Sequence, residues 1–384
     1  MRSNSGLETI CYTDAQDENQ AIRDISNGID LANTAIIFLF VNSSYDLDIL
    51  AQAMNAFDDV PVMGCTTAGS INAGAFKDEG ITAVALPSQL FYATIANFEN
   101  LSELEANQIA NTAQRALTTV NSFIHSDENF RWSKFCVQLI DGTTGQEEKF
   151  TEHISQTLSY IPYIGGSAGD KLRFKKSFVY TNHQFQTNAA AVAFCATTLQ
   201  VKPFFHQHFD ASPDYLIVTS SDTDNRNIKT INGLPASEEY ARHIGVSVND
   251  LSPEVFSLYP LIVQVGGDNY IRSIQRANED GSLTFYCSIS RGIILKVAKT
   301  KDITISLDEA MKTMTREMGD INFILGFNCI LRYLEILEGD KIQDIEMIHR
   351  AINLSGFNSY GEQFQSTHIN QTFTGLAFGG EHTE

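Results

Sequence analysis

The sequence lacks the features that mark a membrane-spanning or secreted chain. Its most apolar run, TAIIFLFVN (34–42), is far shorter than the ~20 residues that a spanning helix needs. The first twenty residues are polar and acidic, without the basic start and apolar stretch of a signal peptide. These absences predict a cytoplasmic protein with no membrane element.

Basic residues are also scarce. The 384 residues include 26 Lys and Arg against 46 Asp and Glu, which gives a formal net charge of -20. Nucleic acids and anionic membrane surfaces both require a basic face, so this balance argues against both as partners. A local basic pocket for a small ligand is still compatible with it.

The cysteines show no paired spacing. There is no Cys-x-x-Cys and no His-x-x-x-His on a helical pattern, so the sequence predicts neither a zinc site nor a disulfide framework. We expect reduced, mostly buried thiols. The six cysteines are Cys11, Cys65, Cys136, Cys195, Cys287 and Cys329.

Strands and helices alternate along the first half of the chain, and paired strands dominate the second half. Short apolar segments predict buried strands, and longer segments with apolar residues every three or four positions predict helices. The sequence therefore predicts a mixed α/β fold without an internal repeat. We expect a polar N-terminal extension (1–30), an alternating strand–helix domain (31–210) and a more antiparallel, strand-rich domain (211–384).

Three local predictions concern single segments. Residues 177–182 and 189–197 read as the two strands of one hairpin. Residues 323–336, FILGFNCILRYLEI, read as one strand. Residues 368–379, HINQTFTGLAFG, read as a final strand that returns into the C-terminal domain.

Two glycine-bounded loops follow predicted strands. In GCTTAG, Cys65 and Thr66 belong either to a nucleophile or anion-binding loop, or to a tight turn with a buried thiol. No local base supports a nucleophile, and we favour the buried thiol. In GGSAGD, Gly166 and Ser167 either let a ligand approach the backbone or allow two elements to pack closely.

The densest set of site-like polar residues lies near the C-terminus, in GFNSYGEQFQSTHINQTFTG (356–375). These residues either line a ligand cavity or satisfy buried backbone groups. We favour ligand contact by at least one of them. The candidates are Tyr360, Glu362, His368, Asn370 and Gln371.

These stretches, in this order, resemble the FIST proteins, which carry paired FIST N and FIST C domains. The resemblance rests on VMGCTTAGSI, GGSAGD, FNCILRYLE and the C-terminal stretch, and covers nearly the whole chain after the first thirty residues. FIST domains are regarded as small-ligand sensors in signal transduction, so the resemblance implies a sensor and not an enzyme. The chain departs from the family at Ser70 and Asn328, where a Glu and an Asp are common.

The C-terminal stretch and His208 also resemble the nitric-oxide-sensing NosP branch of the family. This resemblance implies b-type haem held by a histidine, either His208 or His368, with Arg272 and Arg332 beside the propionates or the ligand. It implies nitric oxide as the signal and a histidine kinase or a cyclic-di-GMP enzyme as the partner. A homo-oligomer is compatible with it.

A second hypothesis keeps the sensor and changes the ligand. An amino acid or other small polar molecule would bind among the polar residues of the C-terminal stretch, with Arg332 contacting a carboxylate. An enzyme acting through Cys65 or Asp141 is the least supported, since no nucleophile, base and orienting residue come together in the sequence. Asp141 reads as a helix-entry residue or, at a strand's carboxyl end, as a ligand-facing acid.

Overall fold

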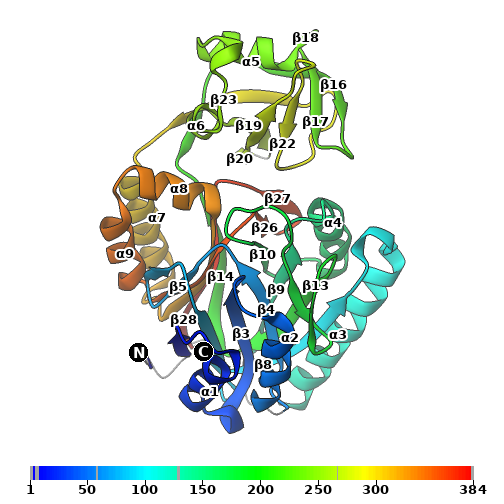
Figure 1. Cartoon of the computed structure of the whole chain (residues 1–384). Helices are drawn as coiled ribbons and strands as arrows, with labels where there is room; N and C mark the ends of the chain where they lie inside the picture. The colour runs from blue at the N-terminus through cyan, green and yellow to red at the C-terminus, as the bar shows by residue number, and fades with distance from the viewer. Residues whose placement is uncertain (1–2, 5–7, 58, 128–129, 266, 382–384) are drawn as a thin grey trace.

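The computed structural model describes residues 3–4, 8–57, 59–127, 130–265 and 267–381. The described residues up to 206 and from 301 onward form a large body, and those between 207 and 300 form a small domain above it in Figure 1. The predicted mixed α/β class is confirmed. No helix in the described part of the chain is both long and apolar enough to span a membrane.

The body repeats one topology three times. Each repeat runs strand, helix, strand, helix, strand, hairpin and closing strand. The first repeat consists of β2 (Thr9–Thr13), α1 (Glu18–Gly28), β3 (Thr34–Asn42), α2 (Leu47–Ala53), β4 (Val62–Thr67), β5 (Ser70–Asn72), β6 (Ala75–Lys77) and β7 (Ile81–Pro87). The second consists of β8 (Phe91–Phe98), α3 (Ala106–Ser126), β9 (Ser133–Asp141), α4 (Glu147–Leu158), β10 (Tyr163–Ala168), β11 (Val179–Thr181), β12 (Gln184–Gln186) and β13 (Ala190–Thr197).

The third repeat differs by two helices in place of one and by an insertion. It consists of β14 (Leu199–His206), α7 (Ile303–Met318), β24 (Phe323–Cys329), α8 (Ile330–Glu338), α9 (Ile342–Ala351), β25 (Leu354–Ser359), β26 (Glu362–Phe364), β27 (Thr367–Ile369) and β28 (Phe373–Glu381). The small domain is inserted between β14 and α7. The prediction of no internal repeat is therefore wrong. The order of strands and helices recurs three times, although the amino-acid sequence does not show it.

Each repeat gives its hairpin to the sheet of another repeat. The three sheets have the orders β2-β7-β3-β4-β11-β12, with β1 (Ser3–Asn4) beside β2, then β8-β13-β9-β10-β26-β27, and β14-β28-β24-β25-β5-β6. The hairpin of the first repeat thus lies in the third sheet, that of the second in the first, and that of the third in the second. This cyclic exchange joins the three sheets into one closed body.

The three sheets enclose a shared apolar core, and helices cover their outer faces. Phe40 from the first sheet, Leu139 from the second and Phe357 from the third all lie in this core. The Phe40 and Phe357 rings stack with centroids 4.9 Å apart. Because most central strands are buried on both faces, they read as continuous apolar runs in the sequence.

Every repeat contains one parallel strand pair, and the carboxyl ends of the three pairs meet beneath the small domain (Figure 1). Main-chain hydrogen bonds join the three ends in a ring. Ala68 N donates to Asn358 O at 3.3 Å, Ser167 N to Gly361 O at 2.8 Å, and Gly169 N to Thr66 O at 2.9 Å. Ligands commonly bind at this end of α/β sheets.

The small domain has its own sheet and its own core. Its elements are β15 (Phe209–Ala211), β16 (Leu216–Asp222), β17 (Asn227–Ile231), β18 (Leu234–Pro235), α5 (Ala236–Ile244), α6 (Pro253–Leu258), β19 (Leu261–Val265), β20 (Asp268–Arg272), β21 (Ile274–Ala277), β22 (Leu283–Phe285) and β23 (Ile294–Thr300). Leu216, Tyr240 and Phe285 are buried together inside it. None of its described strands joins a sheet of the body.

The division of the chain in space can be compared with the predicted segments. β2 and α1 of the first repeat fall within residues 1–30. The predicted boundary, near Ala211, lies in β15, the first strand of the small domain. Residues 211–384 are divided between the small domain and the third repeat, because the chain returns to the body after β23.

Two of the three local predictions need correction. The hairpin of residues 177–182 and 189–197 is wrong, because β11 pairs with β4 and β12 whereas β13 pairs with β8 and β9. The single strand at 323–336 is wrong after Cys329, where α8 begins and buries Ile330, Tyr333 and Ile336 at helical spacing. The final strand is present but interrupted, since Gln371 has a φ of 49° between β27 and β28. The six thiols are free and buried, as expected.

The closest approach between two strands of the third sheet generates a stability prediction. Gly356 on β25 lies opposite Gly326 on β24, and a Cβ at Gly356 would stand 1.7 Å from the Gly326 carbonyl oxygen. We expect Gly356→Ala to lower the free energy of unfolding in urea by about 2 kcal/mol or more, because the paired strands must separate. Gly380→Ala is the control. A Cβ at Gly380 would meet no atom within 4 Å beyond its chain neighbours, and the expected change in the free energy of unfolding is below about 0.5 kcal/mol. Equal effects of the two changes would contradict this packing.

Candidate functional site

A cavity of about 360 Å³ lies between the strand ends of the body and the small domain. The body contributes the loop that follows β9 and two aromatic rings. The small domain contributes two arginines, an aspartate and further aromatic rings. The lining residues are Gly142, Thr143, Thr144, Gly145, Glu147, Phe174, Asp224, Asn225, Arg226, Gln275, Arg276, Thr284, Phe285, Tyr286 and Tyr360.

Asp141 organises the loop on the body side of this cavity. Its Oδ1 accepts hydrogen bonds from Thr143 N at 2.9 Å and from Ser177 Oγ at 2.5 Å, and its Oδ2 accepts one from Asn188 N at 2.7 Å. The carboxylate is therefore saturated by the protein. Asp141 thus acts as a helix-entry residue that organises the loop leading to α4, and not as a ligand-facing acid. Thr143 and Thr144 line the cavity instead.

A second aspartate holds the aromatic rings. Asp170 accepts hydrogen bonds from the main-chain N–H groups of Phe174, Lys175 and Lys176 and from the Tyr360 hydroxyl. Burial alone would raise the pKa of Asp170, but these hydrogen bonds hold it below its usual value. The turn brings Phe174 onto Tyr360, with ring centroids 4.4 Å apart, and Tyr286 of the small domain lies 6.1 Å from Phe174.

An ion pair crosses from the small domain to the start of α4. Arg226 Nη2 contacts Glu147 Oε2 at 2.8 Å and Glu148 Oε2 at 2.5 Å. Glu148 Oε1 also accepts a hydrogen bond from Ser288 N at 2.8 Å. Burial raises the pKa of Glu147, and Arg226 opposes that shift. Both carboxylates contact the same guanidinium nitrogen. The Nε and Nη1 donors of Arg226 make no hydrogen bond to another described residue.

A chain of buried polar groups runs below the other side of the small domain. His208 Nε2 donates to Glu335 at 2.8 Å, and Arg332 Nη1 donates to His208 Nδ1 at 3.0 Å. Arg332 Nε donates to Asn328 Oδ1 at 3.2 Å, and Asn328 Nδ2 donates to Asn358 Oδ1 at 3.0 Å. Burial lowers the pKa of Arg332 to about 10 and lowers that of His208. These hydrogen bonds connect His208, between the two domains, to the strand ends.

Glu362 is fully buried at the start of β26. Its two oxygens accept hydrogen bonds from Ser359 Oγ at 2.5 Å and from Thr372 Oγ1 at 2.6 Å. Burial raises the pKa of Glu362 to about 8, although both hydroxyl donors favour the charged form. The carboxyl group is therefore protonated in much of the folded protein near neutral pH.

His368 lies in a separate buried cluster. Gln363 Nε2 donates to Ser167 Oγ at 2.9 Å and lies 3.0 Å from His368 Nδ1. Burial lowers the pKa of His368 to about 4, so the imidazole is neutral. Asn370 beside it is buried, and neither atom of its amide has a partner among the described residues.

The remaining predicted residues lie in the core or at the domain contact. Cys65 is in the shared core, and burial raises the pKa of its thiol far above the usual value, which agrees with a buried thiol. Thr66 Oγ1 accepts a hydrogen bond from Phe178 N at 2.9 Å. Gly166 packs against Phe357, whose Cζ would stand 2.7 Å from a Cβ at residue 166. Close packing, and not ligand approach, explains this glycine.

Two predicted residues stand near the small domain. Gln371 Oε1 accepts a hydrogen bond from Ser273 Oγ at 2.7 Å, and its Nε2 donates to Ser257 O at 3.2 Å. Arg272 Nη1 donates to Ile271 O at 3.1 Å. The structure thus places Tyr360 in the cavity wall, whereas the other predicted residues lie in the shared core, in the two buried polar clusters or at the domain contact. The cavity residues that the sequence did not indicate include Thr143, Phe174, Arg226, Arg276 and Tyr286. The last two lie in YIRSIQRANEDGSLTFYCSIS, one of the stretches between the motifs of the resemblance.

The histidines can be examined as haem ligands, because an axial imidazole needs a free ring nitrogen and an apolar slot beside it. Both nitrogens of His208 are engaged, by Arg332 and Glu335. At His368, Nδ1 contacts Gln363, and Nε2 would lie 2.8 Å from a Cβ placed on Gly361. The surroundings of neither histidine fit a haem iron in this arrangement. No group of three or more His, Cys, Asp or Glu in the described part of the chain could hold a metal ion.

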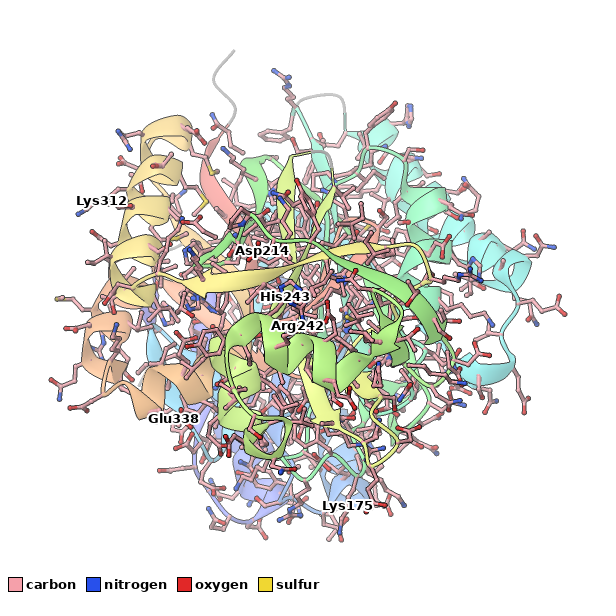
Figure 2. All side chains as sticks on the ribbon, turned by 90° about the horizontal axis from the view of Figure 1, so that it is seen from above. Lys175, Asp214, Arg242, His243, Lys312 and Glu338 are labelled. Carbon is pink, nitrogen blue, oxygen red and sulfur yellow. The ribbon has the colours of Figure 1, made fainter. Side chains whose placement is uncertain are left out.

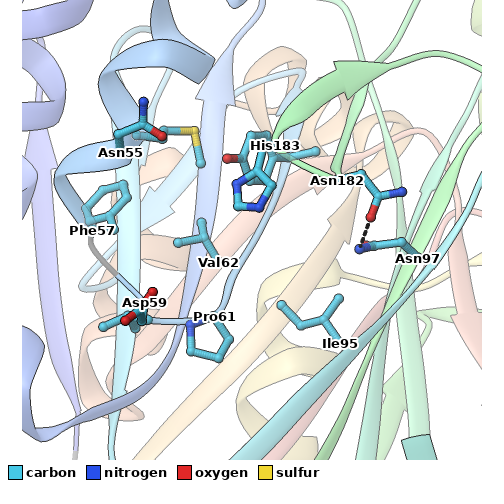
Figure 3. A pocket seen from close by; sticks show the side chains of 12 residues that line it. Asn55, Phe57, Asp59, Pro61, Val62, Ile95, Asn97, Asn182 and His183 are labelled. Atoms are coloured by element: carbon cyan, nitrogen blue, oxygen red, sulfur yellow. Dashed lines mark hydrogen bonds between the residues drawn. The ribbon is translucent and has the colours of Figure 1, made fainter. Parts of the chain in front are cut away.

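Another cavity, of about 310 Å³, lies near the amino end of β4 (Figure 3). It is lined by Asn55, Phe57, Val62 and Ile95, among other residues. The titratable side chains in its wall are scattered, and Asn97 Nδ2 donates to Asn182 Oδ1 at 3.1 Å across its rim. This cavity lies at the amino end of β4, whereas the 360 Å³ cavity lies near the carboxyl ends of the parallel strands, where ligands commonly bind. The 310 Å³ cavity is therefore the weaker candidate for a ligand site.

Two family models together match most of the chain, and they meet inside the small domain. The FIST N domain model matches residues 35–234, and the FIST C domain model matches residues 236–365. The chain belongs to the FIST family. FIST domains are associated with small-ligand sensing in signalling. No curated protein matches the chain significantly. Residues from both FIST matches line the 360 Å³ cavity.

The buried carboxyl of Glu362 predicts a pH dependence of stability. The pKa near 8 in the folded protein lies above the value of ~4.3 for an unfolded glutamate, so this group stabilises the fold fully below about pH 4.3. That contribution is lost as the pH rises through 8. We expect the free energy of unfolding in urea to fall by up to about 1.4 kcal/mol per pH unit between pH 6 and 8 because of this group.

Glu362→Gln should weaken this dependence, because the amide keeps the shape without the titration. The control is Glu338→Gln, an exposed position on α8 that is labelled in Figure 2, which should follow the parent protein. Parallel pH profiles for the parent and Glu362→Gln would show that Glu362 does not titrate in this range.

Proposed function

We propose that the protein is a sensor of a small polar molecule that binds in the cavity between the body and the small domain. The observation that supports this most is the composition of the cavity wall. It combines charged groups of both signs, hydroxyl groups and aromatic rings from two parts of the molecule. A ligand there would contact both domains at once, as a signal that depends on domain arrangement requires.

The wall suits a ligand with both a carboxylate and an amine. The free donors of Arg226, together with Arg276, would bind a carboxylate. Glu147 would face a ligand ammonium group, and Tyr286 and Tyr360 would contact an apolar portion. The volume of about 360 Å³ is within the usual range of small-molecule sites. An amino acid or a metabolite of similar size fits these properties best.

The signal would pass to a partner protein and not into a reaction. FIST domains are sensor domains, which supports a non-enzymatic role. A histidine kinase or a cyclic-di-GMP enzyme in the cytoplasm is the partner that the resemblance implies. Haem-based sensing of nitric oxide stays a prediction from the resemblance, and a visible spectrum after addition of haem tests it.

Thermal shift measurements with the amino acids, one at a time, test this proposal. A ligand at ~100 times its Kd adds about 2.7 kcal/mol of stability, which is a readily measured rise in Tm. Arg276→Ala and Tyr286→Ala should abolish the rise, because they remove two walls of the cavity. Arg291→Ala, an exposed change in the same domain outside the cavity wall, should retain it.

The opposite result is equally specific. A rise in Tm that survives both cavity changes would place the ligand elsewhere. A Soret band after addition of haem, lost in His368→Ala or His208→Ala, would instead support the haem hypothesis.

A further inference from the structure

Both chain connections between the small domain and the body lie on one side of the molecule. The chain leaves β14 through Gln207 and His208 and returns after Thr300, and both connections descend on the same side of the molecule in Figure 1. They are also bonded to each other, because Phe209 pairs with Thr300 and Lys301 N donates to His208 O at 2.8 Å. Two adjacent connections form a single axis about which the domain can turn.

An ion pair between the two parts lies on the opposite side of the small domain from this axis (Figure 1). There Arg226, at the turn between β16 and β17, reaches Glu147 and Glu148 at the start of α4. Arg226 is 19% exposed and Glu147 is 3% exposed, so this contact is partly shielded from water. Removing one partner of a charge pair in such a position strongly destabilises the contact between the two parts, because the other charge is left buried without compensation.

The other contacts between the domains, besides those of Phe174 and Glu148 described above, are both polar and aromatic. Gln371 bonds to Ser273 and Ser257, and the Phe205 ring stacks on Tyr270 with centroids 5.6 Å apart. No described strand continues from one part into a sheet of the other. Mixed interfaces of this kind within one chain usually permit relative domain motion, unless they are large and hydrophobic.

We propose that the small domain is a hinged lid, with its axis at His208 and Lys301 and with Arg226, Glu147 and Glu148 as the latch that holds it shut. Without Arg226, two neighbouring carboxylates would face the lid with no cation between them, and their desolvation and repulsion would favour opening. Two residues of the latch, Arg226 and Glu147, also line the cavity. A ligand that reaches Arg226 or Glu147 therefore competes for the latch and shifts the balance between open and closed forms.

Only this last step, the effect of a ligand, rests on the proposed function. The hinge and the latch are properties of the chain without any ligand. Motion about the axis would also reach the body, since His208 is bonded through Arg332 and Asn328 to the strand ends.

A distance measurement across the latch tests the proposal. The native cysteines are all buried, so cysteines introduced at the exposed positions Lys229 on β17 and Glu152 on α4 can be spin-labelled selectively. In the full chain without ligand, double electron–electron resonance should give one narrow distance distribution. Arg226→Ala should shift this distribution to longer distances and broaden it.

Two further variants make the result decisive. Arg242→Ala removes a bidentate pair with Glu239 inside α5, on the outer face of the same domain (Figure 2), and should leave the distances unchanged. The double change Glu147→Gln and Glu148→Gln removes the latch charges from the body side at nearly constant volume, and should open the lid as Arg226→Ala does. It also serves if Arg226→Ala fails to fold.

Distances that stay at the parent value when the latch is removed from either side would overturn the proposal. Because no ligand is present, that outcome would leave ligand binding in the cavity untouched. Conversely, a lid that opens in these variants while no ligand raises the Tm would support the latch and count against the proposed function.

Discussion

The body depends on one constraint: no repeat can pair all the backbone N–H and C=O groups of its own strands. The last strand of each parallel pair would be an open edge, with a row of unpaired N–H and C=O groups. The hairpin of another repeat covers it in each case: Val179 lies opposite Cys65, Gly166 opposite Glu362, and Gly356 opposite Ile71. The three repeats are therefore complete only together, and the shared core forms as a consequence.

This constraint also explains why the polar residues of the C-terminal stretch are where they are. The turn between β25 and β26 belongs to the ring of main-chain hydrogen bonds at the strand ends. From that position Tyr360 reaches the cavity, while Glu362 and His368 point into the protein and become buried. A single stretch of sequence thus supplies one residue to the cavity wall and several to the support behind it.

The fold class could be predicted from the sequence because central strands buried on both faces appear as apolar runs. The repeat could not, because its signal is an order of pairing between segments, and the residues of the three repeats differ. Residues 330–336 follow β24 without a break in apolarity, which concealed the start of α8. Arg226 and Tyr286 join the cavity only through the placement of the inserted domain, so no local pattern marks them. Tyr360 stood out because it lies among polar residues between glycines.

The exchange of hairpins has a consequence for the order in which the protein can be made. Gln363 on β26 bonds to Ser167 on β10, 196 residues earlier in the chain. The second sheet therefore keeps an open edge during synthesis until β26 and β27 have left the ribosome, and the third sheet is incomplete until β28 has followed. Contacts of such long range form slowly, and unpaired edges favour aggregation in the meantime. A newly made chain is thus expected to be prone to aggregation until the β26–β27 hairpin and the closing strand β28 are in place.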